Sequence, residues 1–347
     1  MFFIRADGNP EIGSGHIMRC LTIAQALLDV GQECMFVVAD QGAVPTLEEA
    51  GMPFICLHSV WNDLDQETDQ MEALIAQRGI RALLIDSYFV TPDYLRRLHR
   101  RTHVICMDDL NLFHYPCSTL INYAFYADAW NYPARYSGVN LLLCPRYAPL
   151  RREFQDLPPH VIRQQVRDIL VTTGGGDPLN IAVRFVQRAK QTPAAAGFHY
   201  HIVAGRFNRH LEELDALARR YPGVSIHRSV TRMSELMCAC DIAVSAAGTT
   251  LYELCACGLP TLTYVLADNQ IMNAVSFAEA GTMLCAGDIR QEKYISKHLF
   301  ELLDTLADDR ILRQTMAERM QSIVDGKGAD RLAEDILKVY GEREQFE

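Results

Sequence analysis

The sequence contains no apolar run long enough to cross a membrane and no excess of positive charge. Its 347 residues include 33 lysines and arginines against 43 aspartates and glutamates, which gives a net charge of −10. A membrane-spanning helix needs about 18–20 apolar residues in a row, so we expect no stable membrane insertion. The acidic balance argues against nucleic acid as a partner. It leaves room for a local phosphate site built from helix N-termini and a few arginines.

Secretory leaders, internal repeats and low-complexity tracts are also missing from the sequence, and the cysteine count of eleven is odd. We therefore expect a cytoplasmic protein with reduced, mostly buried thiols. The pairs Cys238/Cys240 and Cys255/Cys257 could ligate zinc, but a structural zinc site usually has partner ligands at matching spacings. We predict no metal and no cofactor, and a monomer or weak dimer.

Short apolar runs alternate with helical patterns in both halves of the chain. The strands that we expect lie at residues 1–4, 34–39, 53–57, 82–86, 104–107, 119–122, 168–173, 200–204, 224–226, 241–245 and 260–265. This alternation predicts an α/β protein with two Rossmann-like domains, whose parallel sheets face a cleft. Prolines interrupt the pattern in the middle of the chain. We expect domains at 1–145 and 161–347, a linker at 146–160, and a final helix that returns to the first domain.

The first candidate site is the stretch Gly13-Ser14-Gly15-His16-Ile17-Met18-Arg19, which follows a short strand and opens a helix. Ile17, Leu21, Ala24 and Leu28 would form the buried stripe of that helix. The positive end of a helix dipole disfavours a protonated imidazole. His16 is therefore a candidate general base, although it could merely cap the helix.

Polar, glycine-rich turns follow several strands in the second half. Gly174-Gly175-Gly176-Asp177 would let backbone approach a ligand closely, and Gly248-Thr249-Thr250 opens a helix whose N–H groups could hold a diphosphate. Glu253, one turn later, could accept hydrogen bonds from ribose hydroxyls. Alternatively, Thr249 and Glu253 could be only a helix cap and its partner. Asn269-Gln270 begins a further helix on the same side of the sheet.

Together these motifs resemble those of GT-B-type nucleotide-sugar enzymes, and most closely the UDP-sugar hydrolase family of pseudaminic acid biosynthesis. The likeness spans nearly the whole chain, and further motifs share it: Arg5-Ala6-Asp7, Asp86-Ser87-Tyr88, Asp108-Asp109-Leu110 and residues 147–154. The block from Gly248 to Glu253 is shared with many glycosyltransferases. The resemblance implies a GT-B architecture, and UDP-2,4-diacetamido-2,4,6-trideoxy-β-L-altropyranose or a close relative as the substrate.

The reaction that the resemblance implies is hydrolysis of the UDP-sugar to free sugar and UDP. UDP would bind the second domain, while His16 activates a water that attacks the anomeric carbon with inversion. The diphosphate would leave toward the helix that begins after Gly248, without a metal. An Asp-x-Asp pair is present only at Asp63/Asp65, in an acidic stretch where a metal-dependent transferase would not place one.

The resemblance also implies two sets of binding residues. The UDP-binding set is Gly174, Gly175, Met233, Gly248, Thr249, Thr250 and Glu253. The set for sugar and diphosphate is Arg5, Asp7, Gly15, Arg19, Asp86, Tyr88, Asp109, Tyr147, Arg151, Asn269 and Gln270. Asp7 could instead orient Arg19 or His16, and Arg151 could instead form an interdomain salt bridge.

The sequence departs from the family pattern at two places. Tyr115-Pro116-Cys117-Ser118 follows His114, where the family often has an aspartate, and Gly176 stands where a serine is common. Both departures leave the identity of the sugar open. Two other functions also remain open, namely a GT-B glycosyltransferase that uses a UDP-sugar donor and a non-catalytic nucleotide-sugar-binding protein.

Overall fold

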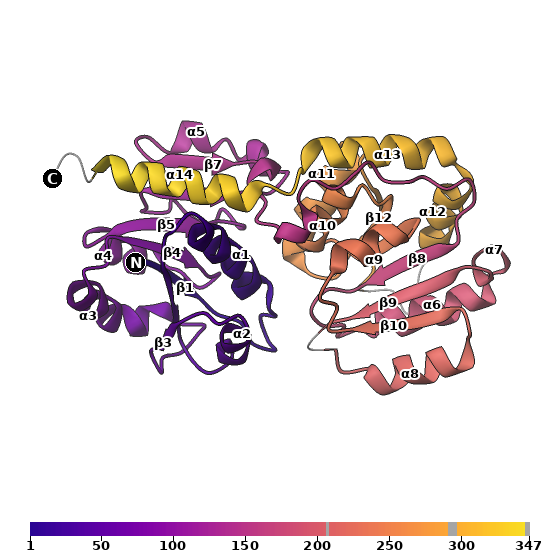
Figure 1. The fold of residues 1–347 in the computed structure, drawn as a ribbon, viewed down its shortest axis with the longest axis horizontal. Coiled ribbons are helices and arrows are strands. Elements are labelled where there is room, and N and C mark those ends of the chain that lie inside the picture. The colour runs from indigo at the N-terminus through magenta and orange to yellow at the C-terminus, as the bar shows by residue number, and fades with distance from the viewer. Residues whose placement is uncertain (206–207, 291–296, 344–347) are drawn as a thin grey trace. The chain divides into compact units, whose positions relative to one another are not determined.

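The computed structural model describes residues 1–205, 208–290 and 297–343. The chain divides into two compact units, shown in Figure 1: unit 1 is Met1–Leu150 with Lys327–Glu347, and unit 2 is Arg151–Gly326. The chain therefore leaves unit 1 after Leu150 and returns to it at Lys327. The segment 146–160, expected as a linker, is divided between the two units.

In its described residues, unit 1 contains a seven-stranded parallel sheet in the order β3-β2-β1-β4-β5-β6-β7. The strands are β1 (Phe2–Ala6), β2 (Cys34–Val38), β3 (Phe54–Cys56), β4 (Ala82–Asp86), β5 (His103–Met107), β6 (Thr119–Asn122) and β7 (Asn140–Leu143). The sequence did not predict β7, a run of only four residues shortly before the prolines of the expected linker. Pairing with β6 makes this short run the edge strand.

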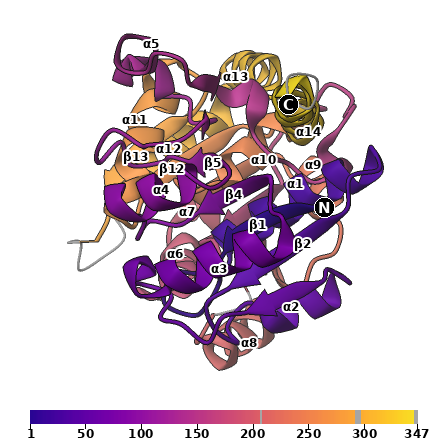
Figure 2. The ribbon, with the colours of Figure 1, turned by 90° about the vertical axis from the view of Figure 1, so that its left-hand side faces the viewer.

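Helices cover both faces of the unit 1 sheet. They are α1 (Gly15–Asp29), α2 (Val44–Glu49), α3 (Thr68–Arg78), α4 (Pro92–His99), α5 (Tyr132–Arg135) and α14 (Gly328–Arg343), with 3₁₀ turns at Leu64–Glu67, Ala127–Trp130 and Pro145–Tyr147. Figure 2 shows α3 and α4 in front of the strands, where Met71, Tyr94 and Leu98 pack on the sheet. α14 packs along α1.

The buried stripe of α1 differs from the predicted one. Ile17 and Ala24 are buried as expected, and Cys20 and Leu27 join them, but Leu28 is 37% exposed. A helix that contacts both its sheet and α14 buries a broad face, and residue 27, rather than 28, lies at the centre of that face.

The described part of unit 2 contains a six-stranded parallel sheet in the order β10-β9-β8-β11-β12-β13. Its strands are β8 (Asp168–Thr172), β9 (His199–Ala204), β10 (Val224–Arg228), β11 (Ile242–Ala246), β12 (Thr261–Val265) and β13 (Leu284–Asp288). The edge strand β13 was not predicted. Its sequence, Leu-Cys-Ala-Gly-Asp, has only a weak strand pattern.

The helices of unit 2 complete a doubly wound layer structure. They are α6 (Ile181–Gln191), α7 (Pro193–Ala196), α8 (Leu211–Arg220), α9 (Met233–Ala239), α10 (Thr250–Cys257), α11 (Ile271–Glu279), α12 (Lys297–Asp308) and α13 (Arg310–Ile323), with 3₁₀ turns at Arg152–Phe154 and Asp268–Gln270. Phe185, Tyr200 and Phe300 lie in one core beneath the sheet. The predicted α/β class with two parallel sheets is confirmed.

The eleven cysteines are free thiols, and Cys238 is exposed rather than buried as the sequence suggested. Within the described residues, every helix is too short or too polar to cross a membrane.

Candidate functional site

Both sheets place their predicted motifs at a topological switch point. In unit 1, β1 leads to β2 on one side, while β4 lies on its other side. In unit 2, β8 leads to β9 on one side, while β11 lies on the other. Loops that leave the carboxyl ends of such adjacent strands diverge and leave room for a ligand. The loops after β1, β4, β8 and β11 carry most of the predicted residues.

The loop between β1 and α1 is held in shape by its own backbone. Asn9 and Gly13 exchange two backbone hydrogen bonds of 3.3 and 2.8 Å, and Gly13 has φ of +76°. A Cβ at Gly15 would meet nothing within 4 Å, so open space faces this residue. No side chain caps the start of α1 at Ser14. This rigid, open turn positions His16 in the first turn of α1.

His16 is oriented by Asp86, the last residue of β4. The His16 Nδ1 atom lies 2.8 Å from Asp86 Oδ1, and the His16 ring packs edge-on against Tyr88 at a centroid distance of 4.3 Å. An ionised carboxylate can only accept, so Nδ1 donates to Asp86, and in the neutral imidazole the lone pair then lies on Nε2. Among the described contacts, none is a hydrogen bond to Nε2. This is the tautomer that a general base requires.

Arg19 binds the same carboxylate in a two-pronged arrangement. Its Nε and Nη2 atoms donate to the two Asp86 oxygens at 2.6 Å each, while Nη1 donates to Tyr123 and lies 2.8 Å from Asp109. Burial alone would raise the pKa of Asp86, but the charge of Arg19, together with His16, holds that pKa well below its ordinary value. The carboxylate therefore stays charged and keeps both neighbours in place.

These contacts change the roles predicted for two residues. Asp86 is 1% exposed, and both of its oxygens are occupied by His16, Arg19 and Cys20. Arg19 is 8% exposed and divides its donors among Asp86, Asp109 and Tyr123. Neither side chain has a free face for a sugar. Asp86 instead holds the His16 ring and Arg19 holds Asp86, whereas the predicted alternative had Asp7 orient Arg19 or His16.

Arg5 and Asp7 are likewise not at a ligand surface. Arg5 is fully buried and donates to Glu67 at 2.7 and 2.9 Å and to Asp7 at 2.5 Å. The second Asp7 oxygen accepts from the backbone N–H of Ala39 at 2.8 Å. This buried ion network ties β1 to the turn before α3. The sequence could not reveal it, because Glu67 lies 62 residues away in an acidic stretch.

Tyr147 also has a structural role in place of the predicted sugar contact. It is buried, and its hydroxyl donates to Asp335 of α14 at 2.8 Å. By contrast, Asp109 remains suited to a sugar hydroxyl. Its side chain is 17% exposed, and the recorded partners, Arg19 and Tyr88, both contact Oδ2.

In unit 2, the loop after β8 is built from backbone. Gly174 has φ of +81°, a conformation that favours glycine. Asp177 does not face this loop as a ligand group. Its carboxylate caps α6 instead, accepting from the N–H groups of Ile181 at 2.7 Å and Ala182 at 2.9 Å. A Cβ at Gly205 would lie 2.3 Å from the Gly174 carbonyl oxygen, so the loop after β9 supports Gly174 from one side.

The loop after β11 leads into α10 with an open N-terminus. Thr249 is exposed and has helical backbone angles, and its hydroxyl makes no capping hydrogen bond. A Cβ at Gly248 would meet only Gln270 Nε2, at 4.0 Å. The cap that the sequence analysis had weighed as an alternative for Thr249 is therefore absent. The N–H groups of Gly248, Leu251 and Tyr252 already bond to backbone carbonyl oxygens, so the donors at this helix start that suit an anion are the N–H groups of Thr249 and Thr250.

Glu253 belongs to a chain of contacts that the sequence did not reveal. Its Oε1 atom lies 3.4 Å from Arg151, which also pairs with Glu153 at 2.9 Å. Glu153 in turn accepts from the N–H and hydroxyl of Ser234, both at 3.0 Å. Arg151 and both of these carboxylates belong to unit 2, so the two ion pairs are not the interdomain salt bridge that was the alternative for Arg151.

The same series of contacts, from Glu253 to Ser234, ends beside Met233, the residue predicted to contact uracil. Met233 is the first residue of α9 and is buried, and the next N–H group, that of Ser234, is bound by Glu153. Burial raises the pKa of Glu253 despite the opposing charge of Arg151, and Glu153 adds to the increase. The Glu253 side chain keeps 22% of its surface exposed.

Gln270 connects two of the predicted loops. Its Oε1 atom accepts from the N–H of Leu266 at 2.8 Å, just after β12, while Nε2 points toward the Gly248 turn. Asn269 is exposed in the adjoining 3₁₀ turn. Gly174, Gly175, Gly248, Thr249, Asn269 and Gln270 therefore lie in the segments that follow β8, β11 and β12, while Thr250 and Glu253 lie in the first turn of α10.

Comparison with known proteins matches the architecture. Residues 169–336 match the glycosyltransferase family 28 C-terminal domain. The spore coat polysaccharide biosynthesis protein SpsG of Bacillus subtilis is 24% identical over 97% of this chain and 98% of its own length. The UDP-2,4-diacetamido-2,4,6-trideoxy-β-L-altropyranose hydrolase of Campylobacter jejuni is 24% identical over 80% of this chain and 96% of its own length.

Among solved structures, the MurG protein of Acinetobacter baumannii superposes with a TM-score of 0.71 at 15% identity, covering 97% of this chain and 99% of its own. At that identity the likeness concerns the fold. Two parallel doubly wound sheets and a family 28 match over unit 2 and the start of α14 agree with it. The chain therefore has the GT-B fold, and the match to the glycosyltransferase family 28 C-terminal domain is a likeness of residues 169–336.

Proposed function

We propose that this protein hydrolyses a UDP-sugar to free sugar and UDP, with inversion and without a metal in the reaction. The observation that carries the proposal is the His16–Asp86 pair. A carboxylate held ionised by Arg19 fixes Nδ1–H of His16, and Nε2 is left as a proton acceptor at the switch point of unit 1.

In the proposed reaction, Nε2 of His16 takes a proton from water as the water oxygen bonds to the anomeric carbon. The bond from that carbon to the β-phosphate oxygen breaks, and its electron pair leaves with UDP. The N–H groups at the start of α10 would stabilise the departing diphosphate. Glu253 would bind the ribose, Met233 the uracil and Asp109 a sugar hydroxyl, while Gly174 and Gly175 would let UDP approach the backbone.

Sequence likeness along most of the chain favours hydrolysis of an amino sugar of the kind named for the Campylobacter jejuni relative. We therefore place UDP-2,4-diacetamido-2,4,6-trideoxy-β-L-altropyranose first among candidate substrates. The protein would then act in pseudaminic acid biosynthesis.

A second candidate is transfer of the sugar to an acceptor hydroxyl, with the same base and the same leaving group. The match to the glycosyltransferase family 28 C-terminal domain favours this alternative. It differs from hydrolysis only in what Nε2 of His16 deprotonates.

The test is release of UDP from purified UDP-sugars with no acceptor added. Turnover that is linear in enzyme, strongly reduced in His16→Gln and accompanied by inverted free sugar would support hydrolysis. Turnover that begins only when an acceptor is added would replace hydrolysis by transfer. Tight binding of UDP-sugars without turnover, with or without an acceptor, would indicate a non-catalytic nucleotide-sugar-binding protein.

A further inference from the structure

A group of imidazoles lies at the end of the unit 2 sheet opposite to the proposed nucleotide loops. Asp168 is the first residue of β8, and His199 and His201 are the first and third residues of β9. Gly174 follows the other end of β8. A five-residue strand spans about 13–16 Å, so this group is separate from the predicted UDP site.

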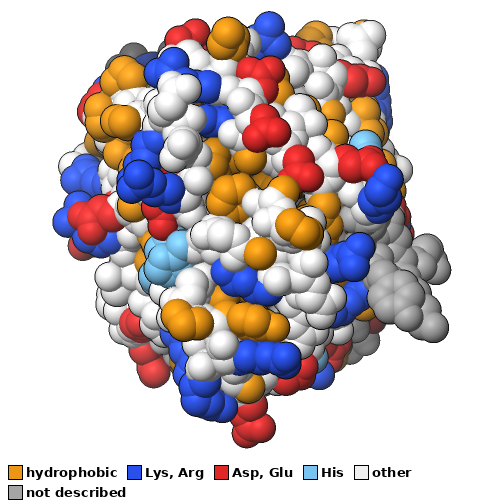
Figure 3. Space-filling model, turned by 90° about the vertical axis from the view of Figure 1, so that its right-hand side faces the viewer, with side chains coloured by type: hydrophobic (Ala, Val, Ile, Leu, Met, Phe, Trp, Pro, Cys, Tyr) orange, Lys and Arg blue, Asp and Glu red, His pale blue; other side chains and the backbone are white. Residues whose placement is uncertain are grey.

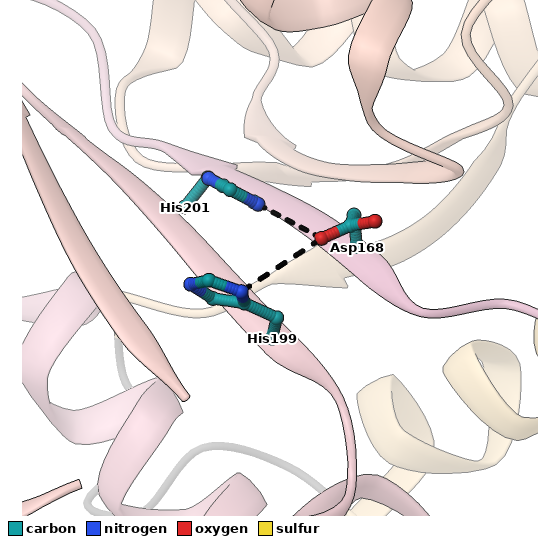
Figure 4. Close-up of side chains that lie close together, drawn as sticks. All are labelled: Asp168, His199 and His201. Carbon is teal, nitrogen blue, oxygen red and sulfur yellow. Dashed lines mark hydrogen bonds and ion pairs between the residues drawn. The ribbon is translucent and has the colours of Figure 1, made fainter. Parts of the chain in front are cut away.

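The strand pairing brings the three side chains together on one face. Asp168 is the register partner of His199, and residues two apart in a strand point to the same side. The His199 and His201 rings stack with centroids 4.4 Å apart. Figure 4 shows Asp168 Oδ1 facing both rings, 3.0 Å from His201 Nε2 and 3.9 Å from His199 Nδ1.

We propose that Asp168, His199 and His201 bind one divalent transition-metal ion of the zinc class. Their three ligand atoms lie within 4.8 Å of one another. Ligands about 2.1 Å from a tetrahedral ion are separated by roughly 3.4 Å, so small side-chain rotations suffice to close the site. Two imidazole nitrogens and one carboxylate oxygen are a set that zinc and its neighbours accept, with water in the remaining position.

Each ligand group is oriented by an outer partner, as metal ligands commonly are. His199 Nε2 lies 2.8 Å from Ser225 Oγ, and His201 Nδ1 lies 3.1 Å from His227 Nε2. The second oxygen of Asp168 accepts from Arg163 at 2.9 Å. These contacts use the atoms that face away from the proposed ion.

The site is also accessible. The His199 side chain is 40% exposed and that of Asp168 is 24% exposed. Figure 3 shows the face of the molecule at the right-hand side of Figure 1, with histidine side chains among those at its surface. An ion could therefore enter from solvent without any rearrangement of the sheet. Bound there, it would join the starts of β8 and β9 and stabilise unit 2, while the proposed hydrolysis proceeds without it.

The test uses the full-length protein after removal of metals with a chelator. Co²⁺ is titrated and its visible absorption recorded, and the melting temperature is measured with and without Zn²⁺. We expect one Co²⁺ per chain with nitrogen and oxygen ligands, and a melting temperature that rises with Zn²⁺ because the ion binds the folded state.

Variants assign the binding to this cluster. We expect His201→Ala to weaken Co²⁺ binding by about 100-fold or more, and Ser225→Ala to weaken it by roughly 10-fold through loss of ring orientation. His199→Gln, at the more exposed ring, provides a second ligand variant if His201→Ala folds poorly. His210→Ala is the matched control, because His210 pairs with Glu213 outside the cluster in the same unit, and its affinity should equal that of the wild type.

Three results would overturn the proposal. The first is absence of saturable Co²⁺ binding. The second is a strong near-ultraviolet thiolate-to-cobalt band, which would place the ion on cysteines. The third is equal affinity in folded His199→Gln or His201→Ala and in His210→Ala.

Discussion

The switch points of the two sheets differ in the groups that they present: charged side chains in unit 1, and glycines and backbone N–H groups in unit 2. In unit 1 the loops present ionised side chains that are already paired with one another, with Asp86 and Arg19 almost fully buried around His16. In unit 2 the loops after β8 and β11 present glycines and an uncapped helix start. A catalytic base needs a fixed orientation, whereas an anion needs unoccupied donors. The contrast supports the proposed division, in which unit 1 supplies the chemistry and unit 2 binds the nucleotide.

The largest expected effect tests whether chemistry resides in unit 1. General-base assistance is worth about 10²–10⁴-fold, so His16→Gln should lower the rate of UDP release by that factor. The dissociation constant of UDP, measured by calorimetry, should stay within about twofold. His99→Gln, an exposed histidine of the same unit, serves as the control. Equal losses of turnover and UDP affinity in His16→Gln would contradict the proposal that unit 1 supplies the chemistry and unit 2 binds UDP.

Asp86→Asn tests whether the side-chain network of unit 1 is held by charge. Removal of one partner from a buried ion pair costs about 3–5 kcal/mol, and here Arg19 would keep at most one of its two short contacts, to an uncharged amide oxygen. We expect that loss in urea-induced unfolding at pH 7, together with lower turnover. An Asp86→Asn protein as stable as the wild type would show that Arg19 finds adequate partners in Asp109 and Tyr123.

The same variant predicts a pH dependence. The pKa of Asp86 is lower in the folded protein than its ordinary value. The stabilisation from this carboxylate is therefore fully present above about pH 4 and is lost as pH falls through the lower folded pKa. The difference in unfolding free energy between wild type and Asp86→Asn should be constant from pH 5 to 7 and should shrink below pH 4. A difference that instead grows on acidification would contradict the ion pair.

Glu253→Ala tests whether unit 2 binds UDP through the ribose hydroxyls. A hydrogen bond to a charged group is worth about 1.5–3 kcal/mol, so UDP should bind roughly 10–100-fold more weakly if Glu253 accepts from the ribose. Glu235→Ala, an exposed carboxylate on neighbouring α9, should leave the affinity unchanged. A fall in stability with unaltered UDP affinity would reduce Glu253 to a structural partner of Arg151.

The smallest expected effect concerns backbone access in unit 2. Gly248→Ala adds a methyl group that meets only the end of Gln270 at 4.0 Å, so the free protein should be as stable as the wild type. A bound diphosphate would lose its close approach, and we expect UDP affinity to fall by up to about 10-fold. Gly205→Ala provides the contrast, because its Cβ would collide with the Gly174 carbonyl oxygen and should destabilise the fold itself. Unchanged affinity in Gly248→Ala would place the diphosphate elsewhere.

The sequence predicted the fold well because its signals are local. Buried strands such as β4 and β8 are short apolar runs, and most loops after them contain glycine or aspartate. The edge strands β7 and β13 were missed, since each depends on one neighbouring strand rather than on a strong pattern of its own.

The sequence motifs identified the candidate site residues, but they did not reveal which of these residues pair with one another in the fold. His16 and Asp86 were both singled out, yet the pairing across 70 residues depends on β1 and β4 lying side by side. The burial of Arg5 with Glu67 was equally hidden. The histidine cluster of unit 2 did leave a signal, because a His-x-His spacing in a strand places both rings on one face.

The return of the chain to unit 1 at Lys327 has a consequence for biosynthesis. α14 packs on α1, Tyr147 binds Asp335, and Gly328 lies so close to Ala148 that a Cβ would stand 2.1 Å from its carbonyl oxygen. During synthesis, unit 2 is complete at residue 326, whereas unit 1 still lacks its last helix. We therefore expect unit 2 to be able to fold before unit 1, and unit 1 to remain open to chaperones until α14 (Gly328–Arg343) has left the ribosome.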